Sequence, residues 1–369
     1  MKKNVHTAGK SRKQKKIMLL LLELLIILLL AIALFITTKL SKIEKNKLDM
    51  NDVSINDDLS DETKEAMAHY KTIALFGLDN RSNGSLSKGN SDVIMLANID
   101  TKQHTINLVS VYRDSYLDTG NGTYQKCNAA YAKGGPEQAL SMLNTNLDLA
   151  ITDYVTVDFN AIIECVDLLG GVDITITDDE ASLMIGYMKE LNELTGHNST
   201  PPASGGTYTL DGVQACAYAR IRYGGDDYRR TERQRTVLTA MMQKAQKSNI
   251  LTLNKLINAA FGDIQTSFSN TDLLALATKV FSYDIGDTTG FPYEKTTHKY
   301  DKIGDVVIPC DLASNVTQLH QFLFNDENYT PSATVLSNSQ QIISNTGYKQ
   351  GDGCLPFLSV NFPVHLFFP

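Results

Sequence analysis

The segment YVTVDFNAIIECVDLLGGVDITIT, residues 154–177, decides the fold class of this chain. Residues 154–157 have the composition of a short strand, and residues 159–169 place apolar side chains at helical spacing. Gly170 and Gly171 end that helix, and residues 172–177 are again a strand pattern. A strand, a helix and a second strand in direct succession predict an α/β fold.

The same alternation continues on both sides of this segment. Apolar runs predict strands at 72–76, 93–99, 105–112 and 217–223, and longer periodic runs predict helices at 178–194, 231–247, 251–261 and 271–281. Pro136, after Gly134 and Gly135, is placed to begin a helix that runs to residue 147. Residues 197–207 read as a loop, and the region after Tyr283 as loop-rich. We therefore expect one α-β-α layered domain around a mixed sheet, covering residues 69–369.

The N-terminus predicts a membrane anchor. A basic tail, residues 1–16, precedes an apolar run at 17–38, which is about 33 Å long as a helix and spans a bilayer. A cleaved signal peptide is the alternative, since Ala31-Ile32-Ala33 resembles a cleavage site, but the apolar run continues beyond it. Basic residues before the span predict a single-pass type II protein of the cell membrane, with a cytoplasmic tail. Residues 39–68 then form an extracellular stalk, partly helical, below an extracellular domain.

Charge and cysteine content restrict the partners of that domain. The formal net charge is −7 although residues 1–16 carry +7, so the remainder is strongly acidic and does not suit nucleic acid. All five cysteines lie after the predicted span. Cys165 and Cys216 read as small core residues, and pairing of Cys310 with Cys354 stays open.

Arginine marks a candidate anion site. Of nine arginines, six fall between residues 220 and 235, and a guanidinium group suits phosphate because its donors form a planar fork. In a strand at 217–223, Arg220 and Arg222 project from one face. On the following helix, Arg230, Arg233 and Gln234 share one side, while Arg229 and Arg235 are expected to be solvated. A salt-bridged surface helix is the alternative explanation of this cluster.

Acidic residues at predicted strand ends complete the candidate site. Asp79 and Arg81 follow the first strand, Asp92 begins the second, and Arg113 ends the third. Two carboxylates beside a phosphate suit Mg²⁺, which prefers oxygen ligands. Each acidic residue taken alone is also an ordinary turn residue. Lys126, just before Asn128, is placed to reach the same pocket.

These residues, in this order, resemble the LytR-CpsA-Psr family. The matching motifs are Gly77–Arg81, Ser91-Asp92, Arg113-Asp114, Lys126–Glu137, Leu169–Asp173, Leu210–Gly212, Tyr218–Arg222 and Arg230–Arg235. They span residues 71–245, and the anchor and acidic stalk also fit. Cys127 and Arg229 depart from the pattern.

The resemblance implies a phosphotransferase that moves a glycopolymer from a polyprenyl-pyrophosphate carrier onto peptidoglycan, at the 6-hydroxyl of N-acetylmuramic acid, with Mg²⁺ as cofactor. It implies catalytic roles for Asp79, Asp92 and Arg113, with Asp79 and Asp92 at the metal. It implies pyrophosphate binding by Arg81, Arg113, Lys126, Arg220, Arg222, Arg230, Arg233 and Gln234. The lipid tail is expected in an apolar cavity between sheet and helices. Which aspartate binds metal and which acts as base stays open. Two alternative functions also stay open: a pyrophosphate hydrolase and a non-catalytic regulator of the cell envelope.

Overall fold

The computed structural model describes residues 44–45, 52–78, 86, 89–222, 227–249, 251–252, 255–256, 264–269, 272, 276 and 280–351. In this part of the chain the centre is a mixed seven-stranded sheet, with strand order β1-β10-β7-β2-β3-β4-β11. The strands are β1 (Glu44–Lys45), β10 (Ile264–Thr266), β7 (Asp153–Val157), β2 (Tyr70–Leu78), β3 (Ser91–Asp100), β4 (Thr105–Val111) and β11 (Asp284–Phe291). β2 runs parallel to β7 and antiparallel to β3, and β4 runs antiparallel to β3 and parallel to β11.

Both faces of the sheet are covered. Because alternate residues of a strand point to opposite faces, β2 supplies two cores. Phe76 and Leu78 pack in the larger core with α3 (Ala129–Leu147), α10 (Leu312–Phe324) and α11 (Ala333–Thr346). Ile73 and Leu75 pack on the opposite face, which α7 (Asp227–Lys247) covers. Burial on both sides explains why β2 and β3 are almost continuously apolar.

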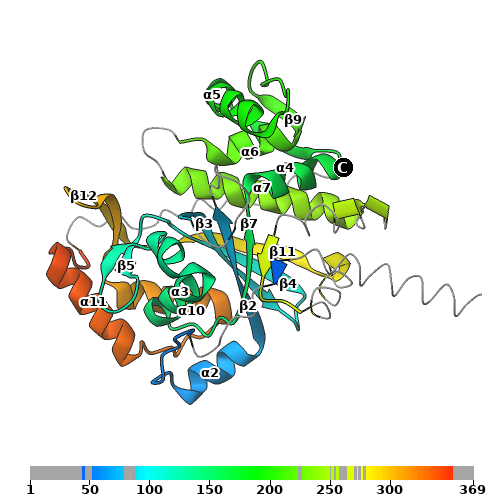
Figure 1. The fold of residues 1–369 in the computed structure, drawn as a ribbon. Coiled ribbons are helices and arrows are strands. Elements are labelled where there is room, and N and C mark those ends of the chain that lie inside the picture. Colours follow the sequence, from blue (N-terminus) through cyan, green and yellow to red (C-terminus); the bar gives the residue numbers. More distant parts are fainter. Residues whose placement is uncertain are drawn as a thin grey trace, which may run out of the picture.

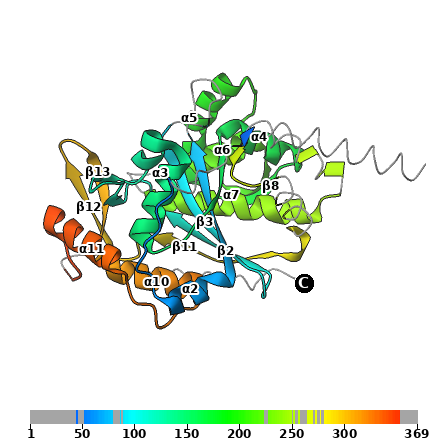
Figure 2. The same ribbon diagram turned by 60° about the horizontal axis from the view of Figure 1, so that its bottom comes forward.

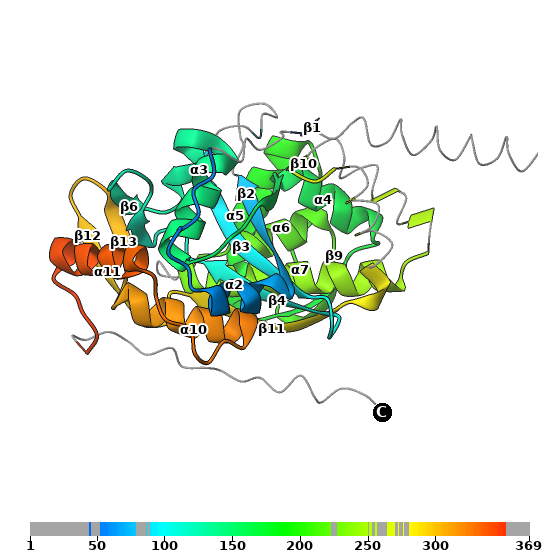
Figure 3. The same ribbon diagram turned by 90° about the horizontal axis from the view of Figure 1, so that it is seen from below.

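The three layers are visible in Figure 1, with α7 above the sheet and α3, α10 and α11 below it. Figure 2 shows α7 running across the strands, and Figure 3 views the helices of the lower layer from their own side. These layers confirm the predicted α/β class, with helices on both faces of the sheet. They also confirm the strands predicted at 72–76, 93–99, 105–112 and 154–157, which are β2, β3, β4 and β7.

A second hydrophobic cluster lies above α7 in Figure 1. Its elements are α4 (Phe159–Leu168), β8 (Val172–Ile176), α5 (Asp178–Thr195), β9 (Gly206–Leu210) and α6 (Gly212–Arg220). The strand–helix–strand pattern of residues 154–177 is confirmed, but its second strand pairs with β9 in a separate two-stranded sheet. Part of the predicted loop at 197–207 thus belongs to β9.

The strand predicted at residues 217–223 is wrong, because residues 217–220 are the last turn of helix α6 and Ile221 is its C-cap, while Tyr223 lies outside the described residues. Asp211 caps that helix: its carboxylate accepts from the Gln214 backbone N–H at 2.8 Å, and the Gln214 side-chain oxygen accepts from the Asp211 N–H at 2.9 Å. This capping box satisfies two backbone donors that would otherwise have no partner. The alternation of Tyr218, Arg220 and Arg222 imitates a strand, but Ala215, Ala217 and Ala219 are strong helix formers.

Two further boundaries differ from expectation. Helix α7 begins at Asp227 rather than near Thr231, and α3 begins at Ala129, with non-helical dihedrals at Gly134 and Gly135 just before Pro136.

The region after Tyr283 is not loop-rich: it contains β11, the hairpin β12 (Lys295–Tyr300) and β13 (Gly304–Pro309), α10 and α11. Strands β11 and β12 contain runs of consecutive exposed residues, so no period-two pattern marks them.

The predicted stalk packs against the domain where it is described. Helix α2 (Asp61–Ala68) starts at the capping residue Ser60, Val53 joins the larger core, and Asn56 donates to the buried Asp148 carboxylate at 2.5 Å. Among the described residues no helix is long and apolar enough to cross a bilayer, and the predicted span at 17–38 lies outside them.

Cys216 is buried, as predicted, and Cys165 is partly buried. Cys310 is disulfide-bonded, and Cys354 lies outside the described residues.

Candidate functional site

A cavity of about 610 Å³ lies between the sheet and helices α6 and α7. Its body is apolar, formed mainly by residues of β2, β3 and β7 on one side and of α4, α6 and α7 on the other: Leu75, Val93, Met95, Val155, Val157, Ile162, Ala219, Val237, Leu238 and Met241. Its remaining lining includes charged and polar residues: Asp92, Asp158, Glu190, Arg113, Arg220, Arg222, Arg230 and Gln234. From Arg230 to Met241, α7 advances about 16 Å, so the cavity accommodates an elongated ligand with a charged head.

Arg113 stands just after β4 and joins three carboxylates. Its Nη1 donates to Asp92 Oδ1 at 2.5 Å, and its Nε lies 3.6 Å from Asp114 Oδ2 and 4.0 Å from Asp227 Oδ1. Burial opposes the charged form, but Asp92, Asp114 and Asp227 outweigh it and raise the pKa of Arg113. The antiparallel pairing of β3 with β4 brings Asp92 and Arg113 to one edge of the sheet.

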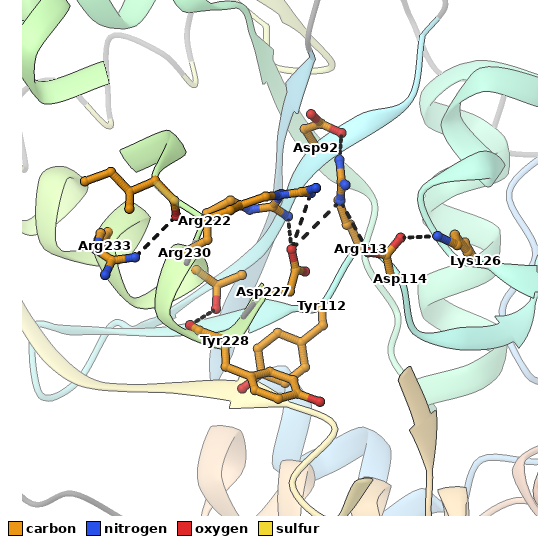
Figure 4. Close-up of polar contacts among 12 residues, drawn as sticks. Asp92, Tyr112, Arg113, Asp114, Lys126, Arg222, Asp227, Tyr228, Arg230 and Arg233 are labelled. Carbon is orange, nitrogen blue, oxygen red and sulfur yellow. Dashed lines mark hydrogen bonds and ion pairs between the residues drawn. The ribbon is translucent and has the colours of Figure 1, made fainter. Parts of the chain in front are cut away.

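Asp227, the first residue of α7, is the centre of the arginine cluster (Figure 4). Its Oδ1 lies 2.5 Å from Arg230 Nη2, 3.6 Å from Arg222 Nη2 and 4.0 Å from Arg113 Nε. Its side chain is 9% exposed, and burial raises the pKa of its carboxyl group, with Arg230 acting in the opposite direction. One carboxylate thus draws three guanidinium groups together at this end of the cavity, while Asp92 and Asp114 also face Arg113.

Arg220 approaches from α6 and is held by aromatic side chains. Its guanidinium carbon lies 4.8 Å from the Phe159 ring centroid and 5.6 Å from that of Tyr187, and its Nη2 lies 3.3 Å from Glu190 Oε2. The backbone N–H of Arg222 donates to the Tyr187 hydroxyl at 3.2 Å. Stacked contacts orient the flat guanidinium group so that an edge is presented to a ligand.

Several buried donors of this cluster make no hydrogen bond. Arg113 Nε, Arg220 Nη1 and Arg230 Nε are inaccessible to solvent and have no hydrogen-bond partner among the described residues. An unsatisfied buried donor costs about 1–3 kcal/mol, and more for a charged group. Three such donors on residues that line one cavity favour binding of an anion with several oxygens.

Six of the predicted site residues line this cavity: Asp92, Arg113, Arg220, Arg222, Arg230 and Gln234. Lys126 is not among the lining residues: its Nζ pairs with Asp114 Oδ1 at 3.0 Å, and Asp114 in turn faces Arg113. Asp79 and Arg81 lie outside the described residues.

Arg233 does not belong to the cluster. It points to α5, where its Nε donates to Glu180 Oε1 at 2.7 Å, and it also donates to the Ile221 carbonyl oxygen. A three-residue step from Arg230 turns it about 60° around the helix, enough to reach a different neighbour. The expectation that Arg233 binds pyrophosphate is therefore not met by its position (Figure 4).

Replacing Arg233 with methionine should lower the free energy of unfolding by about 3 kcal/mol, because Glu180, 15% exposed, loses its cation. Urea unfolding of the purified protein measures this change. The cavity should keep its affinity for inorganic pyrophosphate. An unchanged urea midpoint, or a loss of pyrophosphate binding in a protein that is still folded, would contradict this structural assignment.

Sequence reasoning missed several residues of the site. Asp227 falls between the predicted strand at 217–223 and the predicted helix at 231–247, although an aspartate three residues before Arg230 is a signal of helix-turn pairing. Glu190, Tyr187 and Phe159 carry no local motif, because they meet Arg220 only through the packing of α4, α5 and α6. Arg229 is exposed as expected, but Arg235 is 9% exposed, so its predicted solvation is wrong.

The described residues offer an incomplete metal site. They contain no group of three potential metal-binding side chains, and Asp79 lies outside them. Asp92 lines the cavity with its side chain 28% exposed, beside Arg113. A single carboxylate next to an anion site fits the pattern of Mg²⁺, which commonly takes one or two carboxylates together with substrate phosphate.

Comparison with known proteins identifies relatives of this chain. The sequence profile of the LytR-CpsA-Psr family matches residues 31–301. The chain is 30% identical over 210 residues to the polyisoprenyl-teichoic acid–peptidoglycan teichoic acid transferase TagU of Enterococcus faecalis. The aligned region covers 56% of this chain and 64% of TagU. It is 27% identical over 238 residues to the corresponding TagT of Bacillus subtilis, over 63% of this chain and 71% of that one.

The chain therefore spans just under two thirds of the length of TagU. The structure of the LytR-CPS2A-psr family protein YwtF (TagT) with bound octaprenyl pyrophosphate lipid has a TM-score of 0.51 with 21% identity, covering 70% of this chain and 92% of that chain. At this identity the likeness concerns the fold.

Proposed function

This chain belongs to the LytR-CpsA-Psr family, and we propose that it transfers a glycopolymer from a polyprenyl-pyrophosphate carrier onto peptidoglycan. The observation that carries the proposal is the convergence of Arg113, Arg220 and Arg230, each with an unused buried donor, at the charged end of an apolar cavity. A lipid diphosphate has this combination of a polyanionic head and a hydrocarbon tail. The names of the relatives favour a teichoic acid as the polymer.

The reaction is a displacement at phosphorus. The acceptor hydroxyl of peptidoglycan, proposed to be the 6-hydroxyl of N-acetylmuramic acid, attacks the phosphorus attached to the glycopolymer. The bond from that phosphorus to the bridging oxygen breaks, polyprenyl phosphate leaves, and a phosphodiester joins polymer to wall. The hydroxyl proton passes to Asp79 or Asp92, while the arginines stabilise the charge on the departing phosphate.

Magnesium is proposed as the cofactor, held by Asp92 together with Asp79. Bound there, it would neutralise phosphate charge in the transition state. Arg113 keeps Asp92 oriented toward the cavity through their 2.5 Å hydrogen bond, and this orientation is the contribution of the chain itself.

We also propose that residues 17–38 anchor the protein in the cell membrane, with the domain outside. The proposed substrates support this location, because the carrier lipid lies in the bilayer and the acceptor lies just above it. The negative charge of the domain does not favour binding of nucleic acid, which is also negatively charged.

Affinity for inorganic pyrophosphate should weaken as the pH rises through the raised pKa of Asp227. Below that pKa the carboxyl group is neutral and leaves the guanidinium groups to the ligand, whereas above it the carboxylate competes for them. Folding stability should fall over the same interval, since the folded state binds the proton more tightly than the unfolded state.

Isothermal titration calorimetry across this pH interval measures the pyrophosphate affinity. In Asp227→Asn the part of the pH dependence that comes from this group should be absent, while the titration of pyrophosphate itself is common to both proteins. Identical profiles for the two proteins would exclude competition by Asp227.

The proposed function is tested with the full-length protein in vesicles, a polyprenyl-pyrophosphate-linked glycopolymer and isolated peptidoglycan. The expected product is polymer in phosphodiester linkage to the wall, with about a hundredfold less product from Asp92→Asn. Release of free polymer phosphate into water without attachment would assign a hydrolase instead. Tight binding without turnover would assign a regulator.

A further inference from the structure

Two tyrosines lie beneath the charged end of the cavity, each next in sequence to a residue of the arginine cluster. Tyr112 precedes Arg113, and Tyr228 follows Asp227. Their rings meet edge to face with centroids 4.7 Å apart (Figure 4), and Tyr112 is 2% exposed. Because each ring is one residue from a charged group, this contact sets the spacing between the end of β4 and the start of α7.

A buried lysine from a distant part of the chain supports both rings. Lys295, the first residue of β12, places its Nζ 4.7 Å from the Tyr228 ring centroid and 5.2 Å from that of Tyr112. The same Nζ donates to the Tyr293 carbonyl oxygen at 3.1 Å, and Lys295 is 8% exposed. Lysine is rarely buried, and attraction between a cation and an aromatic ring strengthens when water is excluded.

A second buried cation belongs to helix α7. Arg235 of α7, 9% exposed, interacts electrostatically with Tyr112. The rings of Tyr112 and Tyr228 thus lie in an environment shaped by cations of α7 and of the β12–β13 hairpin. Lys295 does not line the cavity, and its ring contacts link it to the arginine cluster through Tyr112 and Tyr228.

We propose that Lys295 is a positioning residue for the arginine cluster. By holding Tyr112 against Tyr228, it keeps Arg113 and Asp227 at the spacing that an anionic diphosphate head requires. The inference rests on the proposed function, because it assigns a role in binding and transfer of that same ligand. It gives the β12–β13 hairpin a role in the chemistry.

The first test compares the affinity for inorganic pyrophosphate, and kcat/KM for transfer, among three variants of the full-length protein. Lys295→Met keeps the aliphatic stem and removes the cation. It should weaken pyrophosphate binding about tenfold and lower kcat/KM by about tenfold to a hundredfold, since a displacement of 1 Å costs that much. Lys295→Arg keeps a cation over the rings and should recover most of both losses. Lys299→Met, an exposed lysine on the same strand, should change neither.

A double-mutant cycle separates positioning from general loosening of the fold. If Lys295 acts through Arg113 and its partner, Lys295→Met should weaken pyrophosphate binding by less than about twofold in an Arg113→Ala background. The full tenfold loss in that background would overturn the proposal, as would normal binding by Lys295→Met or failure of Lys295→Arg to recover it. If the wild-type protein does not transfer polymer, the proposed function fails, while the pyrophosphate measurements still decide the role of Lys295.

Discussion

Replacing Arg230 with glutamine should lower kcat/KM for glycopolymer transfer by about a hundredfold to a thousandfold. Arg230 is 4% exposed, lines the cavity and pairs with Asp227, and its Nε has no hydrogen-bond partner among the described residues. A buried guanidinium group exerts its field in surroundings of low polarity, so its loss is felt most where phosphate charge develops. Steady-state transfer with the lipid-linked polymer measures the effect.

The adjacent Arg229 gives a matched control. It lies on the same helical turn with the same charge, but it is exposed and does not line the cavity. Arg229→Gln should transfer polymer within about twofold of the wild-type rate, as expected for an exposed charge far from the ligand. Equal losses in both variants would mean that only the net charge of the domain matters. Full activity in Arg230→Gln would remove the anion site from the mechanism.

The sequence predicted the central strands β7, β2, β3 and β4 because both faces of the sheet are buried there, but it did not predict β1, β10 and β11. β2, β3 and β4 are apolar over most of their length, and their predicted boundaries fell within the observed strands, apart from the end of β4. Strand β12 was missed because residues 297–299 are exposed and polar. No apolar run marks a strand whose outer face meets water.

At the candidate site, residue types were predictable and relative positions were not. Arg220 and Arg222 were expected side by side on a strand, yet they reach the cavity from the end of α6 and from the residues after it. Arg230, Arg233 and Arg235 lie at different angles around α7, and the angle determines the surroundings of each side chain. Arg230 lines the cavity, Arg233 pairs with Glu180, and Arg235 interacts with Tyr112. A periodicity argument gives the faces of a helix but not what each face meets.

Filling the apolar end of the cavity should change the preferred length of the lipid chain. Met241 lines the cavity on α7, three turns beyond Arg230, which places it near the far end of an elongated ligand. In Met241→Trp the larger ring occupies volume that a long prenyl chain would take, because packed interiors do not absorb added atoms without strain. The KM for a long-chain polyprenyl-pyrophosphate substrate should rise at least about tenfold, which corresponds to about 1.4 kcal/mol of lost binding.

A short-chain substrate distinguishes this effect from damage to the arginine cluster. A carrier of two or three isoprene units reaches the charged end without extending to Met241, so its KM should stay within about twofold in Met241→Trp. Gln243→Trp adds the same ring to an exposed position of the same helix and should leave both substrates unaffected. Equal losses for short and long carriers in Met241→Trp would show that the prenyl chain does not follow α7. The lipid would then have to leave the arginine cluster in another direction, and the apolar cavity would need a different occupant.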